Sequence, residues 1–203
     1  MKQNRTKVVR LVTFFLGSWL IAQAIIATTG IIKLPSYEKE ILVEIPGPTV
    51  QQMLQVERDL DCLARNIYWE ARSESFEGMV AVAQVTLNRV KHKSFPDSIC
   101  GVVYQGPTRP SWKDGTVYHP VKHRCQFSWY CDGKKPDDIT TVNMSIFDQC
   151  YEVAKKVLID NFRLPRVNNA IFYHADYVDP GWRKPRLTKI GRHIFYGDRN
   201  AIN

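Results

Sequence analysis

Residues 66–90 read NIYWEARSESFEGMVAVAQVTLNRV, and this stretch decides the fold because it joins the end of one helical pattern to the start of another. From about Gln51, apolar residues recur on one helical face, at Leu54, Leu60, Leu63, Ile67 and Ala71. Ser73-Glu74-Ser75 interrupts the pattern, and residues 76–90 are then apolar on more than one side, which is typical of a central helix. We therefore expect two consecutive helices, the second of them buried.

Glu70 stands near the end of the first expected helix, directly after Tyr68 and Trp69. Packing against these rings would disfavour the ionised carboxylate, raise its pKa and leave a proton to donate near neutral pH. The more common arrangement for an acid in an amphipathic helix is a solvated carboxylate or an ion pair, here with Arg65 or Arg72. Taken by itself, Glu70 is one candidate acid among several.

The rest of the chain predicts an α+β fold that is predominantly helical. Residues 98–105 fit either a helical turn or a strand, and the proline-rich residues 106–124 read as a loop. Thr140 or Thr141 can cap a third helix that runs to about Ile159. The runs 170–175 and 189–196 are rich in aromatic and β-branched residues, so we expect them to pair as a small C-terminal β-hairpin.

Polar groups elsewhere leave several roles open. Gln84 and Asn88 lie one turn apart on the apolar helix, where they either brace neighbouring loops or contact a substrate. The chain contains no Gly-x-Ser-x-Gly sequence, the motif that presents the nucleophilic serine in α/β-hydrolases. His119 and His123 have metal-ligand spacing, but Pro120 lies between them, so we interpret them as a loop pair and expect no metal and no cofactor.

The N-terminus predicts export. Residues 1–10 carry four basic residues, and residues 11–32 then form an uncharged run of 22 residues, long enough to cross a bilayer core of roughly 30 Å. The charge distribution places Met1 in the cytoplasm and the remainder outside. Because Ala22-Gln23-Ala24 resembles a cleavage site, the same segment is either a transmembrane signal anchor or a signal peptide cleaved after Ala24.

The domain organisation follows from these features. We expect a basic cytoplasmic start at 1–10, the anchor or signal at 11–32, a proline-containing linker at 33–52 and one folded domain at 53–203. The net charge of +8 points to an acidic polymer or surface as partner. Export makes the cell wall or membrane lipid a better candidate than nucleic acid, which we do not expect to be bound.

All five cysteines follow the apolar segment, in the exported part where disulfides persist. Cys125 and Cys131 bracket a short loop that a disulfide can close. The remaining three cysteines, Cys62, Cys100 and Cys150, cannot all pair within one chain, so at least one thiol stays free.

Several sequence blocks resemble one enzyme family. The stretch 66–90, then FPDSICGVVYQ, CQFSWYCDG, FYHADYVDPGW and IGRHIFY, occur in the same order as in the cell-wall hydrolases typified by spore cortex-lytic enzymes. The resemblance covers about residues 60–196. It implies a lysozyme-like domain of the lytic transglycosylase type, with a groove for the glycan strand of peptidoglycan.

The resemblance also implies roles for particular residues. Glu70 matches the catalytic glutamate of the family's Glu-Ala-Arg motif, although Ser73 stands where a glycine is usual. That glutamate cleaves between N-acetylmuramic acid and N-acetylglucosamine as general acid and base. Because the attacking hydroxyl belongs to the sugar itself, the reaction requires no second protein carboxylate.

The other matched blocks supply the expected substrate-binding residues. Gln126 and Ser128 match the block that lines the groove, and Tyr173, His174 and Trp182 match the C-terminal block. The competing hypothesis is a non-catalytic module that binds peptidoglycan while tethered to the inner membrane through residues 11–32.

Overall fold

The computed structural model describes residues 47–134, 139 and 144–198. The anchor or signal expected at 11–32 lies outside these residues, together with the basic start 1–10 and most of the linker 33–52. None of the helices in the described ranges has both the length and the apolar character needed to cross a membrane. The residues from Pro48 onward form the unit that carries every element named below.

Helix α2 (Val50–Ala71) begins with a capping box. The Gln52 backbone N–H donates to Thr49 Oγ1 (3.2 Å), and the Thr49 N–H donates to Gln52 Oε1 (2.7 Å). These bonds satisfy backbone groups that would otherwise lack partners at a helix start. The helix therefore begins inside the expected linker. Its buried part runs from Leu60 to Ala71, whereas Leu54, which the apolar spacing assigns to the same face, is exposed because the first turns of α2 extend beyond the core.

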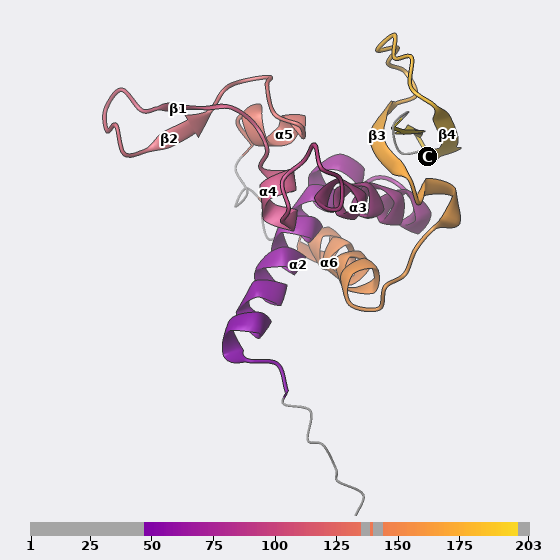
Figure 1. The fold of residues 1–203 in the computed structure, drawn as a ribbon, viewed down its shortest axis with the longest axis horizontal. Coiled ribbons are helices and arrows are strands. Elements are labelled where there is room, and N and C mark those ends of the chain that lie inside the picture. The colour runs from indigo at the N-terminus through magenta and orange to yellow at the C-terminus, as the bar shows by residue number, and fades with distance from the viewer. Residues whose placement is uncertain (1–46, 135–138, 140–143, 199–203) are drawn as a thin grey trace, which may run out of the picture. The chain divides into compact units, whose positions relative to one another are not determined.

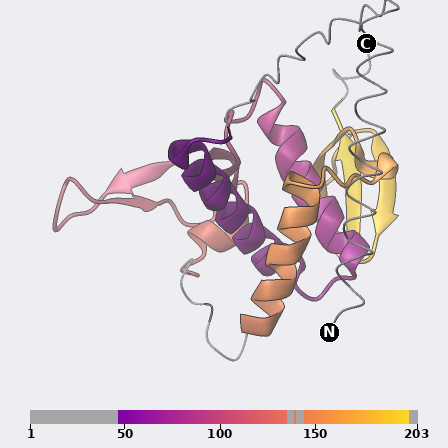
Figure 2. The ribbon, with the colours of Figure 1, turned by 90° about the horizontal axis from the view of Figure 1, so that it is seen from below.

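Helix α3 (Phe76–Val90) is the central element, as its sequence predicts. Ser75 caps it by accepting a hydrogen bond from the Gly78 N–H (3.3 Å). One side of α3 contacts α2, α4 (Ile99–Val103) and α6 (Met144–Leu158), while Ala81 and Val85 pack against the C-terminal strands. Figures 1 and 2 show α3 between the other long helices and those strands.

Two expectations for neighbouring helices are settled by these bounds. The ambiguous stretch 98–105 contains the short helix α4, which Ser98 caps through the Gly101 N–H (3.2 Å). The third expected helix is α6, which ends at Leu158. The expected caps Thr140 and Thr141 lie outside the described residues.

The C-terminal strands form a sheet of three strands, so the expected two-stranded hairpin is wrong in its details. Strands β3 (Ala170–Ala175), β4 (Arg186–Ile190) and β5 (His193–Gly197) are antiparallel in the order β3-β5-β4. The run 189–196, expected to be one strand, is divided by a turn at Gly191, whose φ of 54° lies in the left-handed region that favours glycine. The two predicted runs do pair, as β3 with β5.

Residues 106–124 are not the plain loop that the prolines predicted. They contain an antiparallel hairpin of β1 (Thr108–Pro110) and β2 (Tyr118–Pro120). Both strands are edge strands. Prolines are tolerated there because the position of the missing N–H can face solvent, so that no hydrogen bond between the strands is lost.

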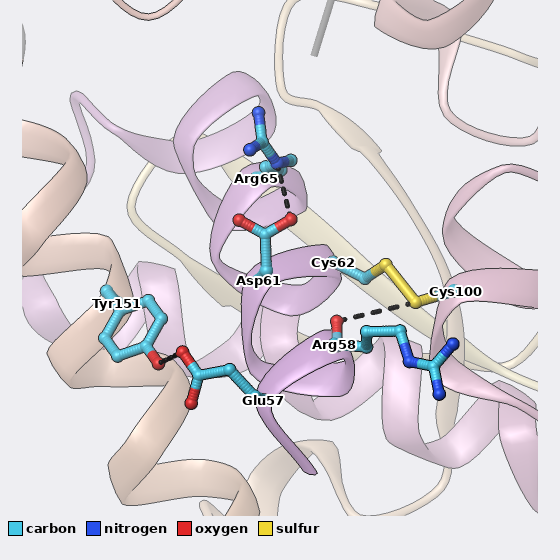
Figure 3. Close-up of polar contacts among 7 residues, drawn as sticks. All are labelled: Glu57, Arg58, Asp61, Cys62, Arg65, Cys100 and Tyr151. Carbon is cyan, nitrogen blue, oxygen red and sulfur yellow. Dashed lines mark hydrogen bonds and ion pairs between the residues drawn. A yellow bond between two sulfur atoms is a disulfide. The ribbon is translucent and has the colours of Figure 1, made fainter. Parts of the chain in front are cut away.

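Disulfides and polar contacts fasten α2 to its neighbours (Figure 3). Cys62 and Cys100 join α2 to α4, and Cys125 and Cys131 close the predicted short loop at α5 (Ser128–Cys131). The fifth cysteine, Cys150, is a buried free thiol on α6. Close to the first disulfide, the Tyr151 hydroxyl of α6 donates to Glu57 Oε1 (2.7 Å) of α2.

Gln84 and Asn88 brace the segment that leads into the sheet. Gln84 accepts from the Leu164 N–H (2.8 Å) and donates to Asn168 Oδ1 (2.9 Å). Asn88 donates to two carbonyl oxygens, those of Val167 (2.9 Å) and Ala170 (2.8 Å). Of the two roles that the sequence left open, the structure therefore shows the bracing one.

Candidate active site

Glu70 lies in the last turn of α2, partly buried, and faces strand β3. The Tyr173 hydroxyl of β3 donates a hydrogen bond to Glu70 Oε2 (2.9 Å) across 103 residues of sequence. The preceding ring of Trp69 stacks on Trp129 with their centroids 6.1 Å apart. The two aromatic residues before Glu70 thus pack on other rings, since Trp69 also meets Tyr68 edge-on with their centroids 5.0 Å apart.

Burial raises the pKa of Glu70 above its ordinary value. Three groups oppose this shift: the hydrogen bond from Tyr173, the positive charge of Arg89 and that of Lys134. Desolvation is the larger effect. A carboxyl group in this position holds its proton to a higher pH than an exposed glutamate, which suits proton donation.

Tyr173 keeps its own proton. Burial, followed by the charge of Glu70, raises the pKa of this phenol well above 10. Its ring lies edge-on to His193 (5.1 Å between centroids) and tilted against Phe195 (5.7 Å). Tyr173 is thus a fixed hydrogen-bond donor to Oε2, which leaves Oε1 of Glu70 as the oxygen able to carry a transferable proton.

Arg89 is a member of the site that sequence reasoning missed. Its Nε donates to the Ile171 carbonyl oxygen of β3 (2.8 Å), and its guanidinium lies 4.9 Å from the Phe127 ring centroid. The side chain is buried, and its Nη1 has no partner among the described residues. A charged residue in the last turn of a largely apolar, central helix is the sequence signal that could have pointed to it.

The two arginines considered as ion-pair partners of Glu70 make other contacts. Arg65 Nε lies 2.7 Å from Asp61 Oδ2, one helical turn earlier. The guanidinium of Arg72 lies over the rings of Tyr68 (4.8 Å) and Trp69 (5.1 Å). The positive charges that act on the Glu70 pKa are instead those of Arg89 and Lys134.

His174 and Trp182 lie together but away from the Glu70–Tyr173 contact. Alternate residues of a strand point to opposite faces, so His174 faces away from the side that Tyr173 occupies. Its ring stacks on Tyr196 (5.2 Å) and meets Trp182 edge-on (5.5 Å). Its Nε2 lies 2.9 Å from the Tyr196 hydroxyl. These residues form a second, partly exposed aromatic cluster.

Gln126 and Ser128 flank the buried Phe127 at the start of α5, and both are exposed. The Gln126 N–H donates to the Gln105 carbonyl oxygen (2.9 Å). Among the described residues, neither side chain is hydrogen-bonded to Glu70. The segment that carries them contacts the site through the Phe127 ring, which lies under the Arg89 guanidinium.

Glu74, which lies between α2 and α3, links the end of α2 to the C-terminal sheet. Its Oε2 accepts from the Arg192 N–H (3.1 Å) in the turn between β4 and β5. A Cβ at Gly191 would collide with the same carboxylate, so only glycine permits this approach. The contact holds the sheet that carries Tyr173 against the end of the helix that carries Glu70.

The model of a family described as Cell Wall Hydrolase matches residues 73–196 of this chain. Spore cortex-lytic enzyme of Bacillus cereus is 30% identical over 143 residues, which cover 68% of this chain and 44% of that protein. The same enzyme of Halalkalibacterium halodurans is 28% identical and is covered over 34% of its length. The chain thus spans less than half the length of these relatives.

Two solved structures are also similar. The catalytic domain of the germination-specific lytic transglycosylase SleB from Bacillus anthracis shares 26% identity and has a TM-score of 0.47, with 75% of this chain and 99% of that chain covered. For the catalytic domain of Bacillus cereus SleB, the identity is 28%, the TM-score is 0.42 and the coverages are 74% and 94%. Together with the family match over 73–196, the relatives establish that this chain belongs to the cell wall hydrolase family.

Proposed function

We propose that this chain cleaves the glycan strand of peptidoglycan between N-acetylmuramic acid and N-acetylglucosamine, as a lytic transglycosylase with Glu70 as general acid and base. The observation that carries the proposal is the Glu70 carboxyl group, partly buried, with a raised pKa and a hydrogen bond from Tyr173. The names of the relatives support the substrate class. Glu70 lies just before the range 73–196 that the family model matches, so its role rests on this geometry.

In the first step, protonated Glu70 donates its proton from Oε1 to the glycosidic oxygen. The bond between that oxygen and the anomeric carbon of N-acetylmuramic acid breaks, and positive charge develops on the sugar ring. Tyr173 continues to donate to Oε2, and Arg89 and Lys134 stabilise the carboxylate that forms. The leaving sugar takes the proton as its new hydroxyl hydrogen.

In the second step, the ionised carboxylate acts as a base. The C6 hydroxyl of the same N-acetylmuramic acid loses its proton to Glu70, and its oxygen bonds to the anomeric carbon. The product is a 1,6-anhydro sugar, and Glu70 regains the proton that it gave up. No second carboxylate is needed, which agrees with the hydrogen bond that Glu74 already accepts from the Arg192 backbone N–H.

The remaining predicted site residues have positioning roles in this proposal. Gln126 and Ser128 bind sugar or acetamide groups at the start of α5. His174 and Trp182 offer an aromatic surface on the outer face of β3, where sugar rings can pack.

The proposal extends to fold family and location. The domain has the lysozyme-like architecture that the sequence resemblance implies. It is exported, and residues 11–32 either tether it to the inner membrane or are removed after Ala24. The domain then acts on the outer side of that membrane.

The decisive test is Glu70→Gln, which keeps the shape of the side chain and removes the transferable proton. We expect turnover of purified sacculi to fall by about a thousandfold or more, since general acid and base catalysis are lost together. The matched control is Glu77→Gln, the same change at an exposed acid of α3 that pairs with Arg166. Product masses distinguish the reaction classes.

Anhydro-muropeptides released by the wild-type chain and lost in Glu70→Gln support the proposal. Reducing ends would assign a hydrolase instead. An unchanged muropeptide profile with the wild-type chain would leave only a binding module. Full activity of Glu70→Gln would remove Glu70 from the mechanism.

A further inference from the structure

The hairpin at residues 106–124, here called the arm, carries large apolar side chains that are exposed in the part of the chain that the structure describes. It projects from the helical part of the domain in both views (Figures 1 and 2). Trp112 near its tip is 89% exposed, and Tyr118 and Val117 are 61% and 44% exposed. Three large apolar side chains on one short hairpin present a contact surface.

The tip of the arm is held in one shape by its own hydrogen bonds. The Ser111 N–H donates to the Val117 carbonyl oxygen (2.7 Å). The backbone N–H and the hydroxyl of Thr116 both donate to Asp114 Oδ1 (2.9 and 2.6 Å). Trp112 is therefore presented on an ordered turn, so less conformational entropy is lost when a ligand packs on it.

The arm is also basic. Residues 106–124 contain the four basic residues Arg109, Lys113, Lys122 and Arg124. Their one acid, Asp114, is engaged by Thr116 within the turn. Lys113 Nζ lies 5.0 Å from the centroid of the Trp112 ring, so positive charge and aromatic surface occur at the same place. This combination is complementary to a partner that carries both apolar faces and anionic groups.

The base of the arm is continuous with the predicted groove block. The Gln126 N–H donates to the carbonyl oxygen of Gln105 (2.9 Å), and the disulfide of Cys125 and Cys131 ties the base to α5. Gly106 packs so closely on Cys125 that a Cβ at this position would overlap its sulfur. A polymer bound at Gln126 therefore has the arm directly beside it.

We propose that the arm is a second contact surface for the same wall polymer, binding stem peptides along the glycan strand. This inference rests on the proposed function. The basic residues pair with the free carboxylates of the peptides, and Trp112 packs on a sugar or peptide face. Continuity with the groove block favours this partner over an anionic membrane surface, for which the charge alone would also be suited.

The test measures binding of the full chain to purified sacculi by cosedimentation, in the Glu70→Gln background so that the polymer stays intact. Trp112→Ala should weaken binding by about tenfold, the loss typical of one central aromatic contact. Combined Arg109→Ala and Lys113→Ala should weaken it and flatten its salt dependence. Matched controls are Met53→Ala and Lys91→Ala, which remove an exposed apolar group and an exposed charge elsewhere.

The outcomes distinguish binding of the wall polymer from binding of a membrane. Sacculi whose free peptide carboxylates have been converted to amides should bind the combined Arg109→Ala and Lys113→Ala variant and its parent equally, because no carboxylate is left for these residues to pair with. Equal sacculus binding by Trp112→Ala and its parent would overturn the proposal, whatever the activity of Glu70→Gln. Association with phosphatidylglycerol vesicles that depends on Trp112, with unchanged sacculus binding, would assign the arm to a membrane and overturn it also. Undiminished cleavage by Glu70→Gln would instead refute the proposed function.

Discussion

The two faces of strand β3 differ in what they can do, although they are built from consecutive residues. On the inner face, Tyr173 reaches Glu70 and packs against His193 and Phe195. On the outer face, His174 and its aromatic neighbours remain partly exposed. The strand therefore separates the Glu70–Tyr173 contact from a partly exposed aromatic surface.

In the proposed function, this difference would let one short strand serve both chemistry and binding. A raised carboxyl pKa requires that water be excluded, whereas a long glycan requires an open approach. Alternation of side chains along β3 lets both conditions hold within a few ångströms of backbone. Substitutions on the inner face should change the chemical step, and those on the outer face should change substrate binding.

Tyr173→Phe should have the larger effect. It removes the hydrogen bond that stabilises the Glu70 carboxylate, so kcat should fall about tenfold to a hundredfold, the range for a hydrogen bond to a charged group. Because that hydrogen bond lowers the Glu70 pKa, its loss should shift the alkaline limb of the pH–rate profile upward. A lower kcat with an unmoved alkaline limb would separate Tyr173 from the acid.

Trp182→Ala should have a smaller effect of a different kind. Loss of this partly exposed ring should raise KM for sacculi about threefold to tenfold and leave kcat nearly unchanged. Tyr177→Ala is the matched control. Tyr177 is also an exposed aromatic residue between β3 and β4, but its ring lies under Arg192 and outside the aromatic cluster of His174, Trp182 and Tyr196. A fall in kcat alone would contradict the division between the two faces.

The smallest effect concerns stability. Since burial raises the Glu70 pKa, its contribution to stability is fully present below the unfolded value near 4.5 and is lost as pH rises through the higher folded value. Glu70→Gln should therefore gain stability relative to wild type over that window and keep the gain above it. Urea unfolding of both proteins between about pH 4 and pH 8 measures this difference. A constant difference would place the carboxyl group in water.

Local patterns account for the parts of the fold that the sequence predicts. The apolar spacing and the caps Thr49 and Ser75 define α2 and α3, because helices are set by residues a few positions apart. The direction of the Glu70 pKa shift agrees with the sequence prediction, and its cause is burial; packing of the carboxyl group on the Tyr68 and Trp69 rings stays a prediction. The short separation of Cys125 and Cys131 made their pairing possible, and the structure confirms it.

Contacts distant in sequence account for what the sequence did not reveal. The division of 189–196 into two strands depends on Gly191, whose backbone lies against Glu74. Arg89 joins the site because Ile171 presents a carbonyl oxygen to it 82 residues later. The edge-on contact of His193 with Tyr173 likewise appears only once β5 pairs with β3. The grouping of Gln126 and Ser128 around a substrate stays a prediction.

The thiol of Cys150 can serve as a probe of how often the domain opens. The Cys150 side chain is completely buried in the core where α6 packs on α2, and burial raises the pKa of its thiol to about 11. The other four cysteines are paired and cannot be alkylated. A thiol reagent can therefore modify a cysteine of this chain only when the core around Cys150 opens. The rate of labelling at a single site then reports how often the domain opens in the oxidising environment where it is expected to work.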